Sequence, residues 1–269
     1  MIEMFEGNLR REAGSSKGNQ LKWFDGTYWY KSDSVGYEGL AEYVCARILR
    51  EHSTLPAGEV TAYETVEMRY KTSVFLGCKS KNILPEGWQL ITLERLIKQQ
   101  TGRSIGADLY RIPDIGERFG YLADMVSRIT GLAGIGAYLA KMLTMDALFL
   151  NEDRHTHNIA VLQSGDGRYH LCPFFDQGAA LLSDTTMDYP LGGDVYSLMK
   201  DVKARTLSES FEESLEAAEK ACGISIKFNY DYGAVTKILQ EEPYYDMAVK
   251  ERVRTILMEQ RRRYAYLFA

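Results

Sequence analysis

A short stretch near the middle of the chain concentrates side chains that can do chemistry. Residues 150–158 read LNEDRHTHN, and Asp176 follows Asn158 eighteen residues later within the run PFFDQG. A carboxylate and an amide five residues apart, followed by a second carboxylate, form an arrangement used in phosphoryl transfer. Asp153 can accept or orient the proton of a nucleophile. The oxygens of Asn158 and Asp176 are hard ligands of the kind that hold Mg²⁺ on nucleotide phosphates.

Phosphoryl transfer also needs a cation near the phosphates, and Lys31 is the candidate because it ends an expected strand. A helix expected at 38–51 follows it and carries Glu38 and Glu42, either of which could hold the lysine. Measured from the apolar stripe centred on residues 44–45, Glu38 lies about 70° away around the helix and Glu42 about 110° away. Helix geometry therefore slightly favours Glu38.

The elements that must position these residues fall into two regions. Before residue 80 the pattern favours strands and one helix (strands 21–24, 27–31, 59–70 and 72–78, with a hairpin turn at Asp25-Gly26; helix 38–51). After residue 90 it favours helices and one hairpin (helices 92–100, 115–129, 134–150, 208–221, 232–240 and 245–267; hairpin 159–171 around Gly165-Asp166-Gly167). We therefore expect an α+β, two-lobed fold, with a small β-rich lobe over 1–82 and a larger, mostly helical lobe over 83–269.

Composition excludes several classes of protein. The chain has 269 residues, of which 45% are hydrophobic and 26% charged, and its formal net charge is −5. These values are ordinary for a globular protein and argue against one that coats nucleic acid. Four scattered cysteines without a C-x-x-C pair predict reduced thiols. No signal-peptide pattern and no apolar run of the ~20 residues that span a bilayer is present. We expect a cytoplasmic protein without membrane or direct nucleic-acid partners.

The sequence around the central stretch resembles the HipA-type kinases, which are serine/threonine kinases on an atypical protein-kinase fold. The shared pattern is N-x-D-x-H-x-x-N at 151–158, with P-F-x-D at 173–176. The run DRHTHN is also similar to the catalytic-loop motif of phosphoinositide lipid kinases. The resemblance extends in order from a Gly-Ser-Ser turn at 14–16 through Lys31 and the run EYVC at 42–45 to Asp176. Two positions depart from it, because HipA sequences commonly have Lys at 157 and Gly at 150.

The resemblance implies a role for each residue of the central stretch. Asp153 would be the catalytic base, and Asn158 and Asp176 would bind Mg²⁺. Lys31 would contact the phosphates of ATP, while His155 would order the catalytic loop without transferring protons. The resemblance thus implies a two-lobed, protein-kinase-like fold that binds ATP and Mg²⁺ between its lobes.

The resemblance also implies how the nucleotide is held. Adenine would hydrogen-bond to backbone near Cys78, Lys79 and Lys81, and the phosphates would lie near a loop with Ser15, Ser16 and Lys17. A serine of this loop can be autophosphorylated in HipA-like kinases, which ejects the loop and silences the enzyme. The run EYVC favours Glu42 over Glu38 as the partner of Lys31.

The implied function is ATP- and Mg²⁺-dependent transfer of the γ-phosphate to a Ser/Thr hydroxyl of a protein, in a toxin–antitoxin module with an antitoxin partner. One alternative is a small-molecule or lipid kinase. Another is a pseudokinase that binds nucleotide or a partner without catalysis.

Simpler explanations remain open for individual residues. Asp153, His155 and His157 could form the metal site of a hydrolase. Asp176 could cap a turn, and Lys31 could be a solvated strand end. Ser15 and Ser16 could be ordinary turn residues. Three hydroxyls after Asp176 could be regulatory or merely exposed (Ser183, Thr185, Thr186).

Overall fold

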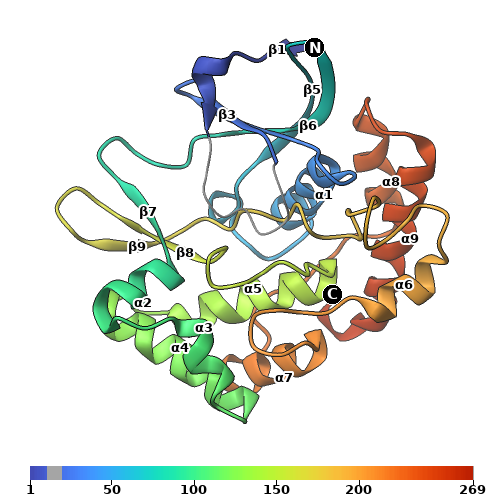
Figure 1. Cartoon of the computed structure of the whole chain (residues 1–269). Coiled ribbons are helices and arrows are strands. Elements are labelled where there is room, and N and C mark those ends of the chain that lie inside the picture. The colour runs from blue at the N-terminus through green and yellow to red at the C-terminus, as the bar shows by residue number, and fades with distance from the viewer. Residues whose placement is uncertain (11–19, 269) are drawn as a thin grey trace. The chain divides into compact units, whose positions relative to one another are not determined.

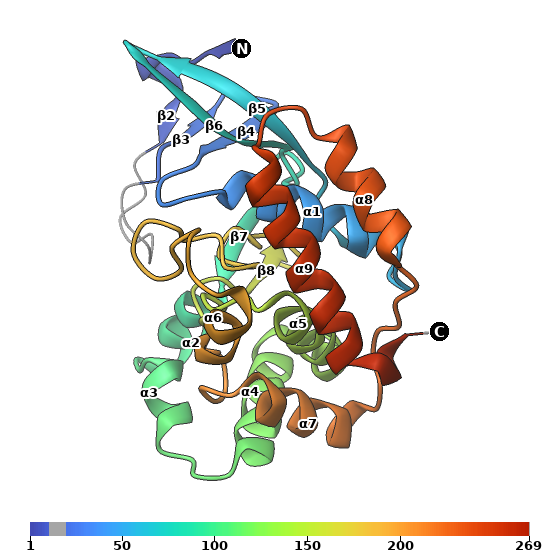
Figure 2. The same cartoon turned by 90° about the vertical axis from the view of Figure 1, so that its right-hand side faces the viewer.

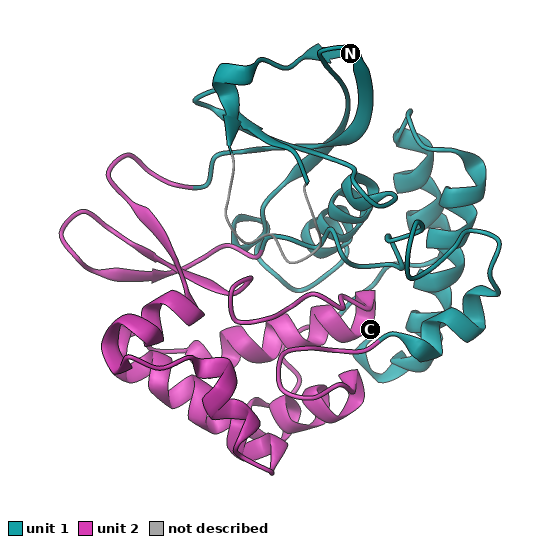
Figure 3. Ribbon diagram, viewed as in Figure 1, with its two compact units in different colours: residues 1–83, 175–202, 228–269 teal, residues 84–174, 203–227 magenta. Residues whose placement is uncertain are grey.

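The computed structural model describes residues 1–10 and 20–268, and these form two compact units. Unit 1 comprises residues 1–83, 175–202 and 228–269, and unit 2 comprises residues 84–174 and 203–227 (Figure 3). Ser15, Ser16 and Lys17 of the expected phosphate loop lie outside the described residues. Each unit is therefore described by itself, from its sheet to its helices.

Unit 1 contains a curled sheet in the strand order β1-β5-β6-β4-β3-β2 (Figure 1). Its described strands are β1 (Ile2–Glu3), β2 (Leu9–Arg10), β3 (Lys22–Phe24), β4 (Tyr28–Ser32), β5 (Tyr63–Tyr70) and β6 (Ser73–Lys81). The β3–β4 turn forms because the Asp25 carboxylate accepts hydrogen bonds from the backbone N–H groups of Thr27 and Tyr28. Gly26 there has a φ of 101°, which glycine adopts without steric cost. The Asp25-Gly26 hairpin is thus confirmed.

Two sets of apolar side chains stabilise this part of unit 1. One cluster forms on the sheet itself (Met4, Trp23, Tyr30, Val66, Met68). The other lies along helix α1 (Glu38–Glu51), whose residues Leu40, Val44 and Ile48 are fully buried. The helix approaches β6 closely where Gly39 meets Gly77, because a Cβ on Gly39 would lie 2.4 Å from the Gly77 carbonyl carbon. Glycine at 39 therefore sets how α1 packs on the sheet.

The rest of unit 1 is mostly helical. It contains α6 (Val195–Asp201), α8 (Tyr232–Glu241) and α9 (Met247–Arg263), with short 3₁₀ turns at Glu6–Asn8, Ala57–Glu59 and Ala265–Leu267. Figures 1 and 2 show α8 and α9 side by side, and the guanidinium of Arg254 on α9 lies 5.1 Å from the Tyr232 ring of α8. Glu241 of α8 accepts a hydrogen bond from Arg47 on α1, and Arg252 of α9 donates to the carbonyls of residues 189 and 190.

Unit 2 consists of a small sheet and a group of helices. The sheet has the order β7-β8-β9, formed by β7 (Gln89–Thr92), β8 (Ala160–Gln163) and β9 (Tyr169–Leu171). Its described helices are α2 (Leu93–Thr101), α3 (Ile105–Tyr110), α4 (Ile115–Thr130), α5 (Ile135–Phe149) and α7 (Phe211–Cys222). Thr92, Asp114 and Ser210 cap three of these helices by accepting a backbone N–H bond. Helix α5 is buried on most faces, as its apolar sequence predicts.

The expected α+β class, with a curled β-sheet lobe and a helical lobe, is confirmed. The helix predicted at 38–51 is correct, and the other predicted helices differ only near their ends. The strand predicted from residue 59 begins instead at Tyr63, because Ala57–Glu59 forms a 3₁₀ turn. The short elements β1, β2, β7, α3 and α6 were not predicted, since few residues give little periodicity. Among the described residues, no helix is long and apolar enough to cross a membrane.

Candidate active site

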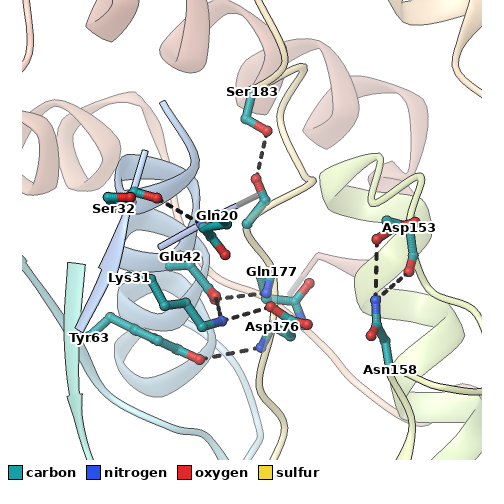
Figure 4. Close-up of polar contacts among 12 residues, drawn as sticks. Gln20, Lys31, Ser32, Glu42, Tyr63, Asp153, Asn158, Asp176, Gln177 and Ser183 are labelled. Atoms are coloured by element: carbon teal, nitrogen blue, oxygen red, sulfur yellow. Dashed lines mark hydrogen bonds and ion pairs between the residues drawn. The ribbon is translucent and has the colours of Figure 1, made fainter. Parts of the chain in front are cut away.

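Lys31 in unit 1 joins two carboxylates that are far apart in the sequence. Its Nζ donates to Glu42 Oε1 and to Asp176 Oδ1, each at 2.7 Å (Figure 4). Asp176 is 145 residues from Lys31 along the chain. The Glu42 side chain is 1% exposed and that of Asp176 is 29% exposed, so one carboxylate is buried and the other reaches solvent. We call these three residues the Lys31 cluster.

Glu42, and not Glu38, is the glutamate that pairs with Lys31. The carboxylate of Glu38 instead accepts backbone N–H bonds from residues 34, 35 and 36, at 2.9, 2.9 and 3.0 Å. Glu38 therefore stabilises the loop that precedes its own helix, and its oxygens are used there. The angular argument from the apolar stripe was wrong because it did not consider that the backbone N–H groups of the preceding loop need an acceptor.

The same carboxylate of Glu42 also anchors the backbone beside Asp176. Gln177 donates its backbone N–H to Glu42 Oε2 at 2.7 Å, and the Asp176 N–H lies 3.3 Å from the Tyr63 hydroxyl (Figure 4). Asp176 has a φ of 63°, a left-handed conformation in which Asp is several-fold enriched among non-glycine residues. These contacts fix the backbone that presents the Asp176 carboxylate to Lys31.

Burial strongly shapes the charges of the Lys31 cluster. Burial alone would lower the pKa of Lys31, but the charges of Asp176 and Glu42 raise this pKa well above its ordinary value. Burial raises the pKa of Glu42, and the positive charge of Lys31 opposes this effect. Lys31 therefore stays protonated at neutral pH.

The segment after Asp176 is tied to other parts of unit 1. Tyr37 donates its hydroxyl to the Leu181 carbonyl at 2.6 Å and its N–H to the Ser183 carbonyl at 3.1 Å. Leu181 and Leu182 both have a φ of 58°, although both are buried leucines. Arg252 on α9 donates to the carbonyls of residues 189 and 190. Ser183 is buried, whereas Thr186 is exposed and donates its hydroxyl to the Val35 carbonyl.

In unit 2, residues 150–158 form a loop directly after α5. Leu150 ends this helix with φ 55° and ψ 49°, the left-handed conformation that favours glycine. The resemblance expects Gly at this position, so the leucine keeps the backbone shape at a cost of roughly 1–2 kcal/mol. Burial of the Leu150 side chain, 1% exposed, offsets this cost.

A buried ion pair between Arg154 and Asp146 links the 150–158 loop to helix α5. Arg154 donates through Nε to both carboxylate oxygens of Asp146 on α5 at 3.2 Å, and these side chains are 2% and 4% exposed. Asn151 donates to the same carboxylate, and Arg154 Nη1 donates to the Asn158 carbonyl at 3.0 Å. Burial raises the pKa of Asp146 to about 6, although Arg154 acts to lower it. The pair fixes both ends of the loop.

Asp153 and Asn158 meet across this loop. Asn158 Nδ2 donates to the Asp153 carbonyl at 2.8 Å and to its Oδ2 at 3.3 Å (Figure 4). His155 Nε2 lies 3.8 Å from Asp153 Oδ1, and the His155 and His157 rings meet edge to face. Within residues 1–10 and 20–268, no group of three or more His, Cys, Asp or Glu residues could hold a metal ion.

Arg205 is a site residue that the sequence did not reveal. Its Nη1 donates to Asp153 Oδ1 at 3.3 Å, although it lies 52 residues further along the chain. No spacing rule links it to the loop, so the sequence carried no signal for it.

The residues expected near adenine lie at the end of β6. Cys78 pairs with Lys31 across β4 and β6 and is buried, and burial raises its thiol pKa well above the ordinary value. Lys79 Nζ lies 3.1 Å from a Glu64 carboxylate oxygen, and Lys81 is exposed at the strand end. The roles of Cys78, Lys79 and Lys81 in binding nucleotide stay predictions.

Comparisons with known proteins support the fold. No protein-family model matches the chain, and no curated protein matches its sequence. The chain is similar to the crystal structure of a Helicobacter pylori proinflammatory kinase, CtkA, with a TM-score of 0.61 and 15% sequence identity over 97% of this chain and 95% of that chain. A second match is HipA from a Shewanella oneidensis HipA–HipB–operator DNA complex, with a TM-score of 0.49 and 13% identity over 94% of this chain and 66% of that one. The likeness to the H. pylori kinase confirms that the chain has a kinase fold, as expected.

Proposed function

We propose that this chain is an ATP- and Mg²⁺-dependent kinase that transfers the γ-phosphate to a Ser or Thr hydroxyl of a protein. The observation that carries the proposal is the Lys31 cluster, in which one partly buried lysine contacts both Glu42 and Asp176 at 2.7 Å. Kinases require a lysine held by a helix glutamate, together with a metal-binding aspartate. A protein with a purely structural role would not need both the Lys31 cluster and the Asp153–Asn158 pair.

In the proposed reaction, Lys31 binds phosphate oxygens of ATP and Asp153 accepts the proton of the acceptor hydroxyl. The acceptor oxygen forms a bond to the γ-phosphorus. The bond between this phosphorus and the β,γ-bridging oxygen breaks, and ADP leaves with the electron pair. The products are ADP, the phosphorylated acceptor and the proton taken up by Asp153.

The available oxygen donors fit a magnesium ion. The Asp176 carboxylate is partly exposed, and the amide nitrogen of Asn158 is committed to Asp153, which leaves the Asn158 amide oxygen as its metal-binding atom. Carboxylate and amide oxygens are the ligands that Mg²⁺ prefers. When bound, Mg²⁺ would neutralise charge on the phosphates. Within this proposal Asp176 and Asn158 are its protein ligands, and His155 orders the loop around Asp153.

Further parts of the proposal rest on the resemblance alone. Residues 1–82 would act as the nucleotide-binding lobe, with adenine near Cys78, Lys79 and Lys81, and residues 83–269 as the lobe that supplies the base. The chain would act with an antitoxin partner, and Ser15 or Ser16 would be the site of autophosphorylation. Mass spectrometry of the chain after prolonged exposure to ATP tests the last point, since an unmodified loop contradicts it.

Transfer of labelled γ-phosphate tests the proposal. Wild type, Asp153→Asn and Asp176→Asn would each be incubated with γ-labelled ATP, Mg²⁺ and a cell lysate that supplies acceptor proteins. Asp124→Asn would be the control. Asp124 is an exposed carboxylate on α4, far in sequence from the loop. We expect labelled phosphoserine or phosphothreonine from wild type and Asp124→Asn only. Equal labelling by all four proteins would contradict the assignment, and label only in lipids or small molecules would favour that class of kinase. ATP-dependent stabilisation without transfer would indicate a pseudokinase.

A further inference from the structure

We propose that Arg205 is a positioning residue for the phosphotransfer reaction, because it holds the carboxylate of Asp153 in the orientation that accepts the acceptor proton. The inference rests on the proposed function. It adds a residue outside the 150–158 loop to those that orient the proposed base, Asp153. Its evidence is the contact of Arg205 Nη1 with Asp153 Oδ1 at 3.3 Å and the way in which the Arg205 backbone is held.

The backbone around Arg205 is fixed to the loop that carries Asp153. Thr206, the next residue, donates its hydroxyl to the Arg154 carbonyl at 2.6 Å, and Arg154 is the neighbour of Asp153. On either side, Ala204 and Leu207 are buried, at 6% and 3% exposure. Arg205 is therefore presented to Asp153 by an anchored segment.

The segment is also tied at both ends by hydrogen bonds. The Ala204 N–H donates to the Glu209 carbonyl at 2.9 Å, and Arg118 on α4 donates to the Leu207 carbonyl. These bonds hold the backbone on both sides of residues 205 and 206. The guanidinium can thus reach Asp153 without an ordering cost for the main chain.

The contact divides the two oxygens of the Asp153 carboxylate between two donors. Arg205 donates to Oδ1, and Asn158 Nδ2 lies 3.3 Å from Oδ2. Each carboxylate oxygen has two lone pairs and can accept more than one hydrogen bond. A carboxylate held at both oxygens keeps one rotamer, and a base in the correct orientation is what proton transfer requires.

A second ion pair in the same segment, between Lys203 and Glu209, is exposed and does not contact Asp153, so it serves for comparison. Lys203 Nζ lies 2.6 Å from Glu209 Oε2, but these side chains are 67% and 77% exposed. The Asp153 side chain is only 9% exposed, whereas that of Arg205 is 50% exposed. Water cannot readily replace Arg205 at Asp153, but an exposed guanidinium can be replaced by one from solution. Lys203 is thus the matched control, and it also makes chemical rescue feasible.

Steady-state phosphotransfer by Arg205→Ala, Arg205→Lys and Lys203→Ala tests the inference, each compared with wild type. For Arg205→Ala we expect kcat to fall about 10- to 100-fold, because a misplaced reacting group costs this much, while KM for ATP stays within about twofold. Arg205→Lys should retain an intermediate kcat and Lys203→Ala the wild-type value. Millimolar guanidinium chloride should restore activity to Arg205→Ala but not to Asp153→Asn.

Several outcomes would overturn the inference. An Arg205→Ala variant as active as wild type makes the contact incidental, and a more active one makes Arg205 a brake on Asp153. A loss that guanidinium does not rescue, with a melting temperature far below that of Lys203→Ala, makes its role structural. If wild type transfers no phosphate, the proposed function fails and this inference fails with it. If wild type transfers phosphate and Arg205→Ala is equally active, the inference is refuted but the proposed function stands.

Discussion

The Lys31 cluster of unit 1 and the 150–158 loop of unit 2 are built in opposite ways. The cluster joins residues 31, 42 and 176, and its two ion pairs span 11 and 145 residues of chain. In the loop, the hydrogen bonds described above for Asp153, Arg154 and Asn158 join residues no more than eight positions apart, and those to the segment around Arg205 span 52. The first region is assembled by the fold, whereas the second is largely assembled by its own sequence.

This difference predicts different consequences of mutation. In the 150–158 loop, which rests on the buried Asp146–Arg154 ion pair, removing one side chain should reduce either the catalytic rate or the stability of the protein. A cluster assembled from distant segments should instead lose nucleotide affinity. The following predictions test this contrast, from the largest expected effect to the smallest.

The largest effect is expected from the base. Asp153→Asn should reduce kcat by about 10²- to 10⁴-fold, because general base catalysis contributes this much. Affinity for Mg²⁺·ATP, measured by calorimetric titration, should stay near the wild-type value because the Lys31 cluster is intact. Asp176→Asn should instead weaken that affinity. If both variants lose affinity equally, the two regions do not have separate roles.

The next effect concerns the stability of unit 2. Asp146→Ala leaves the buried guanidinium of Arg154 without its carboxylate, and breaking a buried pair costs about 3–5 kcal/mol. Chemical denaturation should show this loss in the free energy of unfolding, while Asp124→Ala should differ from wild type by less than about 0.5 kcal/mol. A loss below about 1 kcal/mol for Asp146→Ala would show that the loop does not depend on this pair.

A pH effect is expected from Asp33, which precedes α1 in unit 1. Asp33 accepts hydrogen bonds from the Gly39 N–H and the Tyr245 hydroxyl, at 2.7 Å each. Burial, together with the charge of Glu38, raises the pKa of Asp33 from 3.8 to about 7. The folded state therefore binds this proton more tightly than the unfolded state, so stability increases as pH falls through 7.

Between pH 7.5 and 5.5 the free energy of unfolding of wild type should rise by about 2 kcal/mol relative to Asp33→Asn. Denaturation curves at both pH values measure this difference. The same pH response in both proteins would remove Asp33 as its cause.

The smallest effect separates the two glutamates of α1. Glu42→Gln should lower kcat/KM for ATP by about tenfold, since hydrogen bonds to charged groups contribute about 1.5 kcal/mol or more. Glu38→Gln should stay within about twofold of wild type, because an amide oxygen can still accept from the backbone N–H groups. A larger loss for Glu38→Gln would mean that the loop before α1 controls Lys31 more strongly than Glu42 does.

The sequence predicted what is local. The Asp25-Gly26 hairpin, helix α1 and the fold class were predicted from neighbouring residues, and the 150–158 motif from its spacing. The pairing of Glu42 was favoured only by resemblance, since the helix angle pointed to Glu38, whose role as a backbone acceptor depends on the loop before it. Arg205 could not be predicted because its contact with Asp153 depends on tertiary structure. The same is true of the contacts that Tyr37 and Arg252 make with the segment after Asp176.

The most direct test of the central claim is phosphorus NMR of the protein with ATP, Mg²⁺ and Ser/Thr-containing acceptor peptides. The proposed kinase predicts that the γ-phosphate resonance of ATP decays while resonances of ADP and of a phosphomonoester appear in equal amounts, and that Asp153→Asn prevents both changes. Formation of ADP with inorganic phosphate alone, or ATP that stays unchanged with wild type, would contradict the account.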